Sequence, residues 1–134
     1  MGLILGIDYG SKRVGTAISD ETETIAQAFE ILEVKNDGEA LAKLNEIIKK
    51  YNITFLVIGA PLGLESKPTQ MSETILKFAN ELSKLTNLEY KSWNETLTSE
   101  AAKKNMRNFR RGYIDAEAAR IMLQEYLDYK RFKL

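Results

Sequence analysis

The chain opens with a short apolar run of strand length. Residues 3–7 read Leu-Ile-Leu-Gly-Ile, and Asp8 follows at the end of the run. A nearly unbroken apolar stretch of this length is typical of a strand that is buried on both faces. Gly10 then favours a turn, so a carboxylate stands where a buried strand ends. An acidic residue at this position is either part of the turn or a ligand of a metal ion.

Two further strands are predicted before the first helix. Residues 14–18 alternate larger side chains with small ones, which indicates a second strand. The connection between this strand and the first apolar run is short, which favours an antiparallel hairpin. An acidic turn at residues 20–23 leads into a third predicted strand within residues 24–34. The first part of the chain is therefore expected to form a three-stranded meander.

The rest of the chain alternates helices with strands. Apolar residues recur at helical spacing from Ala40 to Tyr51, with Asp37 as the favoured helix cap. The later elements are predicted as a buried strand over 54–59, a helix over 70–85, a strand over 88–93, a helix over 100–106 and a last helix from 113 or 114 to 129, before a frayed tail. A strand–helix–strand order implies a buried parallel pair.

This order of elements is that of an RNase H-like fold. The expected fold class is α/β, with a five-stranded mixed sheet made of the antiparallel meander and the parallel strands, flanked by helices. No repeat or linker divides the chain, so residues 1–134 are expected to form a single domain.

The composition places the protein among folded cytoplasmic proteins. Apolar residues make up 44% of the chain and charged residues 28%, which excludes disorder as the default state. No apolar run approaches the roughly 20 residues of a membrane span. The first apolar run has no basic segment before it, which argues against a signal peptide and predicts a cytoplasmic protein without a membrane partner.

Two absent residue types narrow the chemistry. The chain has no Cys, so thiolate nucleophiles and Cys-based zinc sites are excluded. It has no His, which excludes Ser-His-Asp and Cys-His catalysis and the usual zinc hydrolase sites. Catalysis would have to use carboxylates, Lys, Arg, hydroxyl groups, or a hard metal ion held by oxygen ligands.

Three acidic residues stand where this fold would bring them together. Asp8 ends the first strand, Glu95 follows the last strand by two residues, and Asp115 lies in the first turn of the last helix. Each has an ordinary explanation alone, as a turn residue, a surface acid or a helix-dipole partner. Three converging carboxylates stay ionised only around a cation, and Mg²⁺ or Mn²⁺ suits an all-oxygen site. The pattern predicts a metal site formed by the three.

Basic residues gather in two places although the net charge is zero. The 19 basic and 19 acidic residues exclude binding of duplex DNA by overall charge. The most basic stretch holds five cations and no acid: Lys103, Lys104, Arg107, Arg110 and Arg111. Ser11, Lys12 and Arg13 follow Asp8 and could present N–H groups and cations to a phosphate, or could simply form a solvated hairpin turn. Trp93 could stack on a base, but a Trp at a strand end is expected in the core.

The motifs around these residues resemble the YqgF family, a group of RNase H-like proteins known as pre-16S rRNA nucleases and as Holliday-junction-resolvase-like proteins. The opening segment Gly-Ile-Asp-Tyr-Gly-Ser-Lys-Arg-Val-Gly-Thr at residues 6–16 is similar to the family signature. The other similar segments cover residues 59–62, 94–101, 114–119 and 123–127. The match runs in order along essentially the whole chain.

The resemblance implies that Asp8, Glu95 and Asp115 are catalytic, metal-binding acids. It favours RNA, specifically the 5′ end of a 16S rRNA precursor, over branched DNA as the substrate. The chain departs from the family at Asn94 and Thr96, where Asp and Arg are usual, and the lost Arg removes a phosphate or transition-state contact. Ala60 replaces a Leu of the family's Gly-Leu-Pro-Leu loop.

The sequence therefore predicts a metal-dependent nuclease, either a monomer or a homodimer, that uses Mg²⁺ or Mn²⁺. Two alternatives within nucleic-acid binding are a Holliday-junction resolvase and a non-catalytic nucleic-acid-binding protein. A phosphotransferase of the sugar-kinase type also opens with Asp-x-Gly-Ser. That class needs a second domain and a second phosphate loop, and 134 residues leave no room for them.

Overall fold

The fold is taken from a computed structural model, which describes residues 2–10, 12–59, 70–93 and 111–132. Side chains are described for these residues except 70–72 and 111–115. The helix predicted over residues 100–106 lies outside the described part of the chain.

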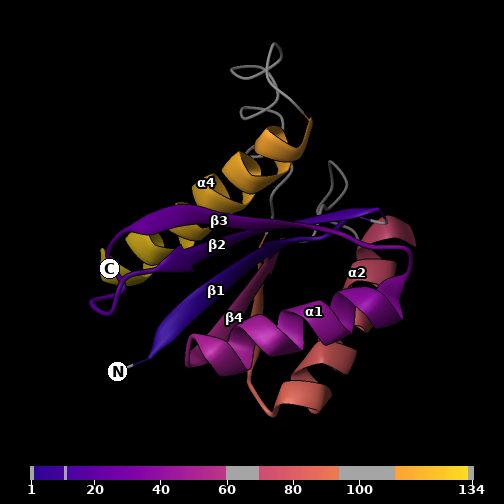
Figure 1. Ribbon diagram of the computed structural model, residues 1–134. Helices are drawn as coiled ribbons and strands as arrows, with labels where there is room; N and C mark the ends of the chain where they lie inside the picture. Colours follow the sequence, from indigo (N-terminus) through magenta and orange to yellow (C-terminus); the bar gives the residue numbers. More distant parts are fainter. Residues whose placement is uncertain (1, 11, 60–69, 94–110, 133–134) are drawn as a thin grey trace.

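Five strands form one mixed sheet in the order β3-β2-β1-β4-β5 (Figure 1). The strands are β1 (Leu3–Asp8), β2 (Arg13–Ser19), β3 (Ala26–Glu33), β4 (Ile53–Gly59) and β5 (Tyr90–Trp93). β1 is antiparallel to β2 and parallel to β4, and β5 is parallel to β4. The predicted meander and parallel strands are both confirmed, although β3 and β5 are shorter than the sequence indicates.

Helices cover both faces of the sheet. α1 (Asp37–Lys50) and α2 (Gln70–Thr86) lie on one face, and α4 (Arg111–Arg131) lies on the other (Figure 1). Leu5 and Ile7 of β1 belong to the core under α1 and α2, whereas Ile4 belongs to the core under α4. Because successive side chains of a strand point to opposite faces, a central strand between two helical layers needs a continuous apolar run. This explains the pattern that opens the chain.

The cap of α1 differs from the prediction. Asn36, not Asp37, is the N-cap: it has an extended backbone, and its Oδ1 accepts a hydrogen bond from the Glu39 N–H at 2.9 Å. α1 therefore begins three residues before the predicted Ala40. Asp37 is its first helical residue, where a negative charge complements the helix dipole.

The β2–β3 turn is organised by Asp20. Its carboxylate accepts hydrogen bonds from the Thr22 hydroxyl at 2.7 Å and from the N–H groups of Thr24 at 2.8 Å and Ile25 at 3.2 Å. The hydroxyl contact, followed by the two backbone contacts, holds the pKa of Asp20 below its usual value. The turn therefore replaces the first two residues of the predicted strand, and β3 begins at Ala26.

α4 is longer than predicted at both ends. It begins at Arg111 and continues to Arg131, so Lys130 is helical instead of frayed. The Lys130 ammonium forms an ion pair with Glu23 in the β2–β3 turn, and this hydrogen bond raises the pKa of Lys130. Near the same end, the Gln124 side chain accepts from the Ala26 N–H and donates to the Thr24 carbonyl, both at 2.8 Å.

These contacts fix the direction of α4. Its carboxyl end lies at the β2–β3 turn, beside the amino end of β1, where the Ile4 N–H donates to Ser19 Oγ at 2.9 Å. α4 therefore runs against the direction of β1, as Figure 1 shows. Its first turns lie toward the carboxyl edge of β1. Among the described residues, none of the helices combines the length and the hydropathy that crossing a membrane would require.

Candidate active site at the carboxyl edge of the central strands

Three parallel strands end side by side at one edge of the sheet. β1 ends at Asp8, β4 at Gly59 and β5 at Trp93. Ile7 is in register with Ile58, and Gly59 is in register with Trp93, so the three ends are level. This is the edge at which open α/β sheets hold their ligands. Asp8 is half-buried there.

Asp8 faces the layer that contains α4. Side chains two residues apart in a strand share a face, so Asp8 lies on the same face as Gly6 and as Ile4, which packs into the core under α4. α4 packs closely on β1 at Gly6. A Cβ atom on Gly6 would lie 3.0 Å from the Leu123 Cβ and 3.5 Å from the Ala119 carbonyl oxygen. Glycine therefore permits a helix-to-strand contact that a side chain would obstruct.

This contact places the backbone of Asp115 near the end of β1. Asp115 precedes Ala119 by one helical turn, which is about 6 Å along the axis. Asp8 follows Gly6 by two strand residues, which is about 6.6 Å. Because α4 and β1 run in opposite directions, both steps lead toward the same edge. The backbone of Asp115 therefore lies at about the level of Asp8 along the direction of β1.

The remaining predicted acid is outside the described residues. Glu95 follows the end of β5 by two residues, and β5 is described only as far as Trp93. The side chain of Asp115 is also outside the described set. No cluster of three or more acidic residues fit to hold a metal ion occurs among the side chains that are described.

The turn after Asp8 is shaped by a second glycine. A Cβ atom on Gly10 would collide with the backbone carbonyl of Arg13, so the chain can return into β2 this tightly only with glycine. The Val34 N–H donates to the Lys12 carbonyl at 2.9 Å and ties the turn to the end of β3. The Lys12 side chain is exposed, while Ser11 is outside the described residues.

Tyr9 links the end of β1 to the helices on the opposite face. Its hydroxyl donates to Asp37 Oδ1 at 2.6 Å, and the centroid of its ring lies 4.8 Å from the centroid of the Phe78 ring of α2. Burial, then the hydrogen bond to Asp37 and the negative charge of that residue, raises the pKa of Tyr9 to about 12. Sequence reasoning missed this residue because its partners lie far along the chain and share no periodic pattern with it.

The other predicted binding residues have mixed outcomes. Arg111 begins α4, but its side chain is not among those described. Four predicted contacts lie in the undescribed segment: Lys103, Lys104, Arg107 and Arg110. Trp93 packs on α4, with its ring 5.6 Å from that of Tyr126 and 5.4 Å from that of Tyr129, which confirms the expectation that it contributes to the core.

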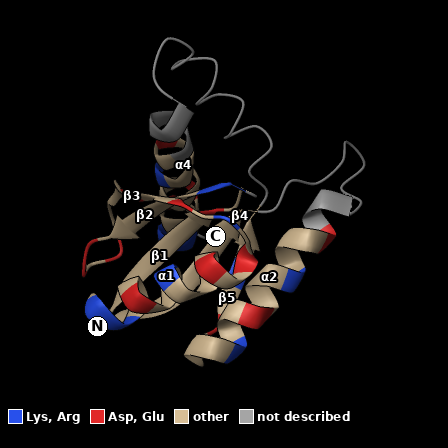
Figure 2. Cartoon of the chain, turned by 45° about the vertical axis from the view of Figure 1, so that its right-hand side comes forward, with Lys and Arg blue, Asp and Glu red and all other residues tan. Residues whose placement is uncertain are grey.

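Acidic and basic residues are interspersed along the helices, as Figure 2 shows for α2. Such mixing agrees with the equal numbers of acidic and basic residues in the sequence. Any attraction of a polyanion must therefore come from a local cluster of cations instead of the field of the whole molecule.

Comparison with known proteins gives a family and a fold. The family model described as "RuvX: Holliday junction resolvase" matches residues 2–129. A protein of Agathobacter rectalis named "Putative pre-16S rRNA nuclease" is 38% identical over 94% of each chain. A protein of the same name from Caldanaerobacter subterraneus subsp. tengcongensis is 33% identical, covering 96% of this chain and 97% of the relative.

Solved structures confirm the RNase H-like fold class. Thermus thermophilus RuvC in complex with Holliday junction substrate superposes with a TM-score of 0.64 at 12% identity, covering 99% of this chain and 97% of that one. The Fowlpox virus resolvase in complex with Holliday junction DNA gives a TM-score of 0.58 at 14% identity, covering 98% and 99%. At these identities the likeness concerns the fold alone. With a family match along nearly its whole length, the chain belongs to the RuvX family, which is the YqgF family that its sequence motifs resemble.

Proposed function

We propose that this protein is a metal-dependent nuclease that hydrolyses phosphodiester bonds at the carboxyl edge of β1, β4 and β5. The observation that carries the proposal is the close contact of α4 with β1 at Gly6, which brings the backbones of Asp115 and Asp8 to one edge. Glu95 follows the strand that ends at the same edge. Membership of the RuvX family and the names of the relatives support the same activity.

The proposed donor set suits a hard divalent cation. Asp8, Glu95 and Asp115 would supply only carboxylate oxygens, and the chain contains neither His nor Cys as a softer ligand. Such a set favours Mg²⁺ or Mn²⁺ over zinc or copper. When bound, a cation of this kind activates water and offsets the charge that develops on a phosphate during hydrolysis.

The chain's own residues would position the reaction. Asp8 is held at the end of a strand that is buried on both faces. The next residue, Tyr9, anchors this end of the strand to α1 and α2. This rigid support would keep the Asp8 carboxylate in a fixed place relative to the scissile phosphate. Lys12 and Arg13, at the turn beside it, would hold a neighbouring phosphate.

The favoured substrate is a precursor of 16S rRNA at its 5′ end. Relatives at 33–38% identity carry the pre-16S rRNA nuclease name, which supports RNA. Branched DNA is the second candidate, supported by the description of the family model as a Holliday junction resolvase. The phosphodiester chemistry would be the same for both.

The test is cleavage of a 16S precursor RNA and of a four-way DNA junction in the presence of Mn²⁺. Asp8→Asn is expected to abolish cleavage, because an amide is a weaker ligand for a hard cation than a carboxylate. Asp128→Asn is the matched control: Asp128 is exposed near the far end of α4, where its contact with Gln124 tolerates an amide oxygen.

Each outcome has a definite meaning. Loss of RNA cleavage in Asp8→Asn alone supports the proposal, and faster cleavage of the junction would assign the resolvase activity instead. Cleavage by Asp8→Asn at the rate of the wild type would exclude the proposed site. Salt-sensitive binding of nucleic acid without turnover by the wild type would indicate a non-catalytic binding protein.

A further inference from the structure

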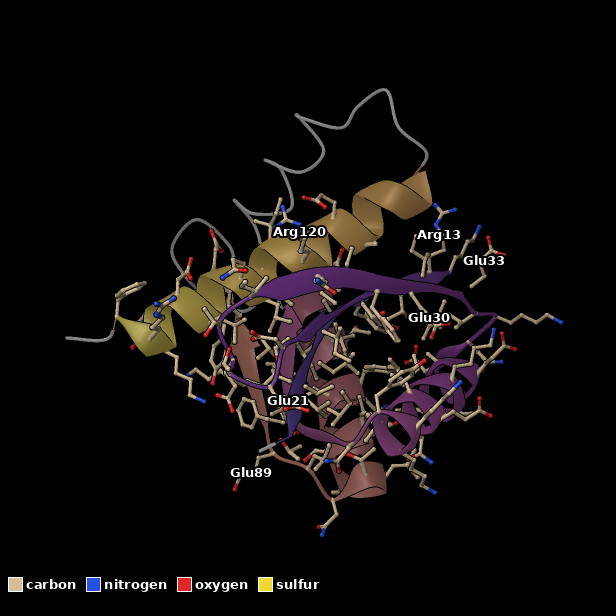
Figure 3. All side chains as sticks on the ribbon, turned by 60° about the vertical axis from the view of Figure 1, so that its left-hand side comes forward. Arg13, Glu21, Glu30, Glu33, Glu89 and Arg120 are labelled. Carbon is tan, nitrogen blue, oxygen red and sulfur yellow. The ribbon has the colours of Figure 1, made fainter. Side chains whose placement is uncertain are left out.

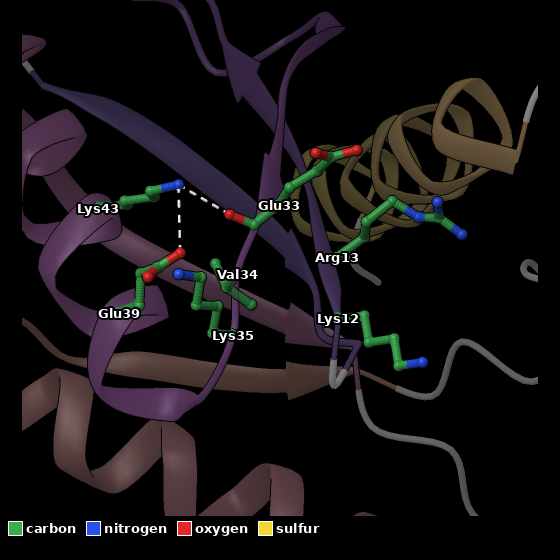
Figure 4. Close-up of a pocket in the computed structure, with 7 residues that line it drawn as sticks. All are labelled: Lys12, Arg13, Glu33, Val34, Lys35, Glu39 and Lys43. Carbon is green, nitrogen blue, oxygen red and sulfur yellow. Dashed lines mark hydrogen bonds and ion pairs between the residues drawn. The ribbon is translucent and has the colours of Figure 1, made fainter.

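A basic groove lies beside the turn that follows Asp8. It lies between the start of β2, the end of β3 and the first turns of α1, and its volume is about 670 Å³ (Figure 4). Its lining residues are Lys12, Arg13, Glu33, Val34, Lys35, Glu39 and Lys43. These residues carry four cations and two carboxylates, an excess of two positive charges on a chain that is neutral overall, and the Arg13 and Glu33 side chains point to the side of the sheet that α4 covers (Figure 4).

The cations of the groove differ in what they contact. Lys43 is part of the wall, because its ammonium donates to the Glu33 carbonyl at 2.7 Å and lies 3.5 Å from Glu39. Lys12 and Lys35 are exposed, and no described residue forms an ion pair or a side-chain hydrogen bond with either ammonium. These two cations are therefore available to an anion in the groove.

Arg13 and Glu33 lie opposite each other on neighbouring strands. They are register partners of β2 and β3, and Figure 3 shows them together at the end of the sheet. Glu33 is exposed and carries a negative charge that opposes an anion beside Arg13. Removing that charge should therefore strengthen anion binding, whereas removing a lysine charge should weaken it. The two kinds of variant thus test the groove in opposite directions.

The groove is connected to the end of β1 by the turn that holds Lys12. Lys12 follows Asp8 by four residues through the tight turn at Gly10, and the bond from the Val34 N–H to the Lys12 carbonyl joins this turn to the groove floor. The volume is in the range of about 300–1,000 Å³ that is usual for pockets holding small ligands. Such a space accommodates a short stretch of one strand.

We propose that this groove binds the sugar–phosphate backbone of a single nucleic-acid strand, which extends from the scissile phosphate past Lys12 and Arg13 to Lys35. The contact is made to phosphates and is therefore independent of base sequence. The proposal rests on the proposed nuclease function only in identifying this strand as the substrate. Binding itself requires neither the metal nor cleavage.

The test measures binding without a divalent cation, by fluorescence anisotropy of a labelled single strand of about 12 nucleotides, a length typical of single-strand sites. Lys35→Gln is compared with Lys49→Gln, which makes the same charge change at the opposite end of α1. Loss of one phosphate contact should reduce the slope of log K against log salt by about 0.7 and weaken binding about fivefold at ~0.1 M salt. Lys49→Gln should match the wild type.

Two further variants sharpen the result. Lys12→Gln with Lys35→Gln should reduce the slope by about 1.4, and Glu33→Gln should tighten binding. RNA and DNA strands of one sequence should respond alike. Equal binding by Lys35→Gln and Lys49→Gln, or weaker binding by Glu33→Gln, would refute the proposal that the groove binds a nucleic-acid strand. If the groove variants behave as expected while Asp8→Asn still cleaves, the groove stands and the proposed active site fails.

Discussion

Replacement of Gly6 by Ala tests the contact that positions α4. The added Cβ would lie 3.0 Å from the Leu123 Cβ, whereas carbon atoms normally rest about 3.5–4.0 Å apart. α4 must therefore move away from β1 by roughly 0.5–1 Å at this point. Because Asp115 lies roughly two turns before Leu123 on the same helix, the displacement would reach the proposed metal site.

Both activity and stability should respond. A misplacement of about 1 Å can cost a hundredfold in rate, so kcat is expected to fall by about tenfold or more. Overpacking costs about 1–3 kcal/mol, and the loss of glycine's freedom in the unfolded chain returns about 0.4–1 kcal/mol. The net loss of about 0.5–2 kcal/mol should lower Tm by roughly 2–8 °C for a chain of this size.

The assay is cleavage of the precursor RNA with Mn²⁺ well below the Tm of the variant, together with thermal unfolding followed by circular dichroism. Gly38→Ala is the control, since Gly38 is exposed in the first turn of α1 and its added Cβ would meet only the Asn36 side chain, at 3.3 Å. It should cleave as the wild type does. Full activity and an unchanged Tm in Gly6→Ala would refute the placement of α4 against β1.

Three further predictions concern the frame around the site. Thr16→Val removes the hydroxyl that accepts from the Glu30 N–H at 2.9 Å and donates to the Glu30 carbonyl at 2.5 Å. Urea unfolding should therefore show a free energy of unfolding that is lower by about 1–3 kcal/mol, and an unchanged urea midpoint would contradict this role. Asn36→Ala should cost about 1 kcal/mol in the same assay while Asn36→Asp retains stability, and equal losses would argue against the cap. Because the pKa of Tyr9 is raised from 10.0 to about 12, its contribution to the free energy of unfolding is present below pH 10 and lost as the pH rises to about 12; Tyr9→Phe should lack this alkaline loss, and identical pH profiles would disprove the contribution.

The sequence predicted the sheet well because burial leaves a clear pattern. A run apolar on both faces identifies β1 as central, and the helical spacing before and after β4 identifies the helices of the opposite layer. The errors fall at the ends of elements, where a single hydrogen bond can determine the residue at which a helix or strand begins. Asn36 and Asp37 are both good caps, and only the bond to the Glu39 N–H distinguishes them.

The site was predictable only in part. The position of Asp8 followed from the end of a buried run, and the backbone of Asp115 reaches the same edge because α4 runs against β1. The Gly6 contact, the link from Tyr9 to Asp37 and the groove at Lys35 depend on tertiary proximity between distant segments. No local pattern in a single sequence encodes such proximity, so these features required the structure.

The central claim is that Asp8, Glu95 and Asp115 hold a divalent cation at the carboxyl edge of β1. The most direct measurement is a crystal structure of the protein soaked in millimolar Mn²⁺, with the ion located by its anomalous scattering. We expect a peak within coordination distance of oxygen atoms from all three carboxylates, and loss of that peak in Asp8→Asn. A structure with no ion between these residues, or with Mn²⁺ bound elsewhere, would contradict it.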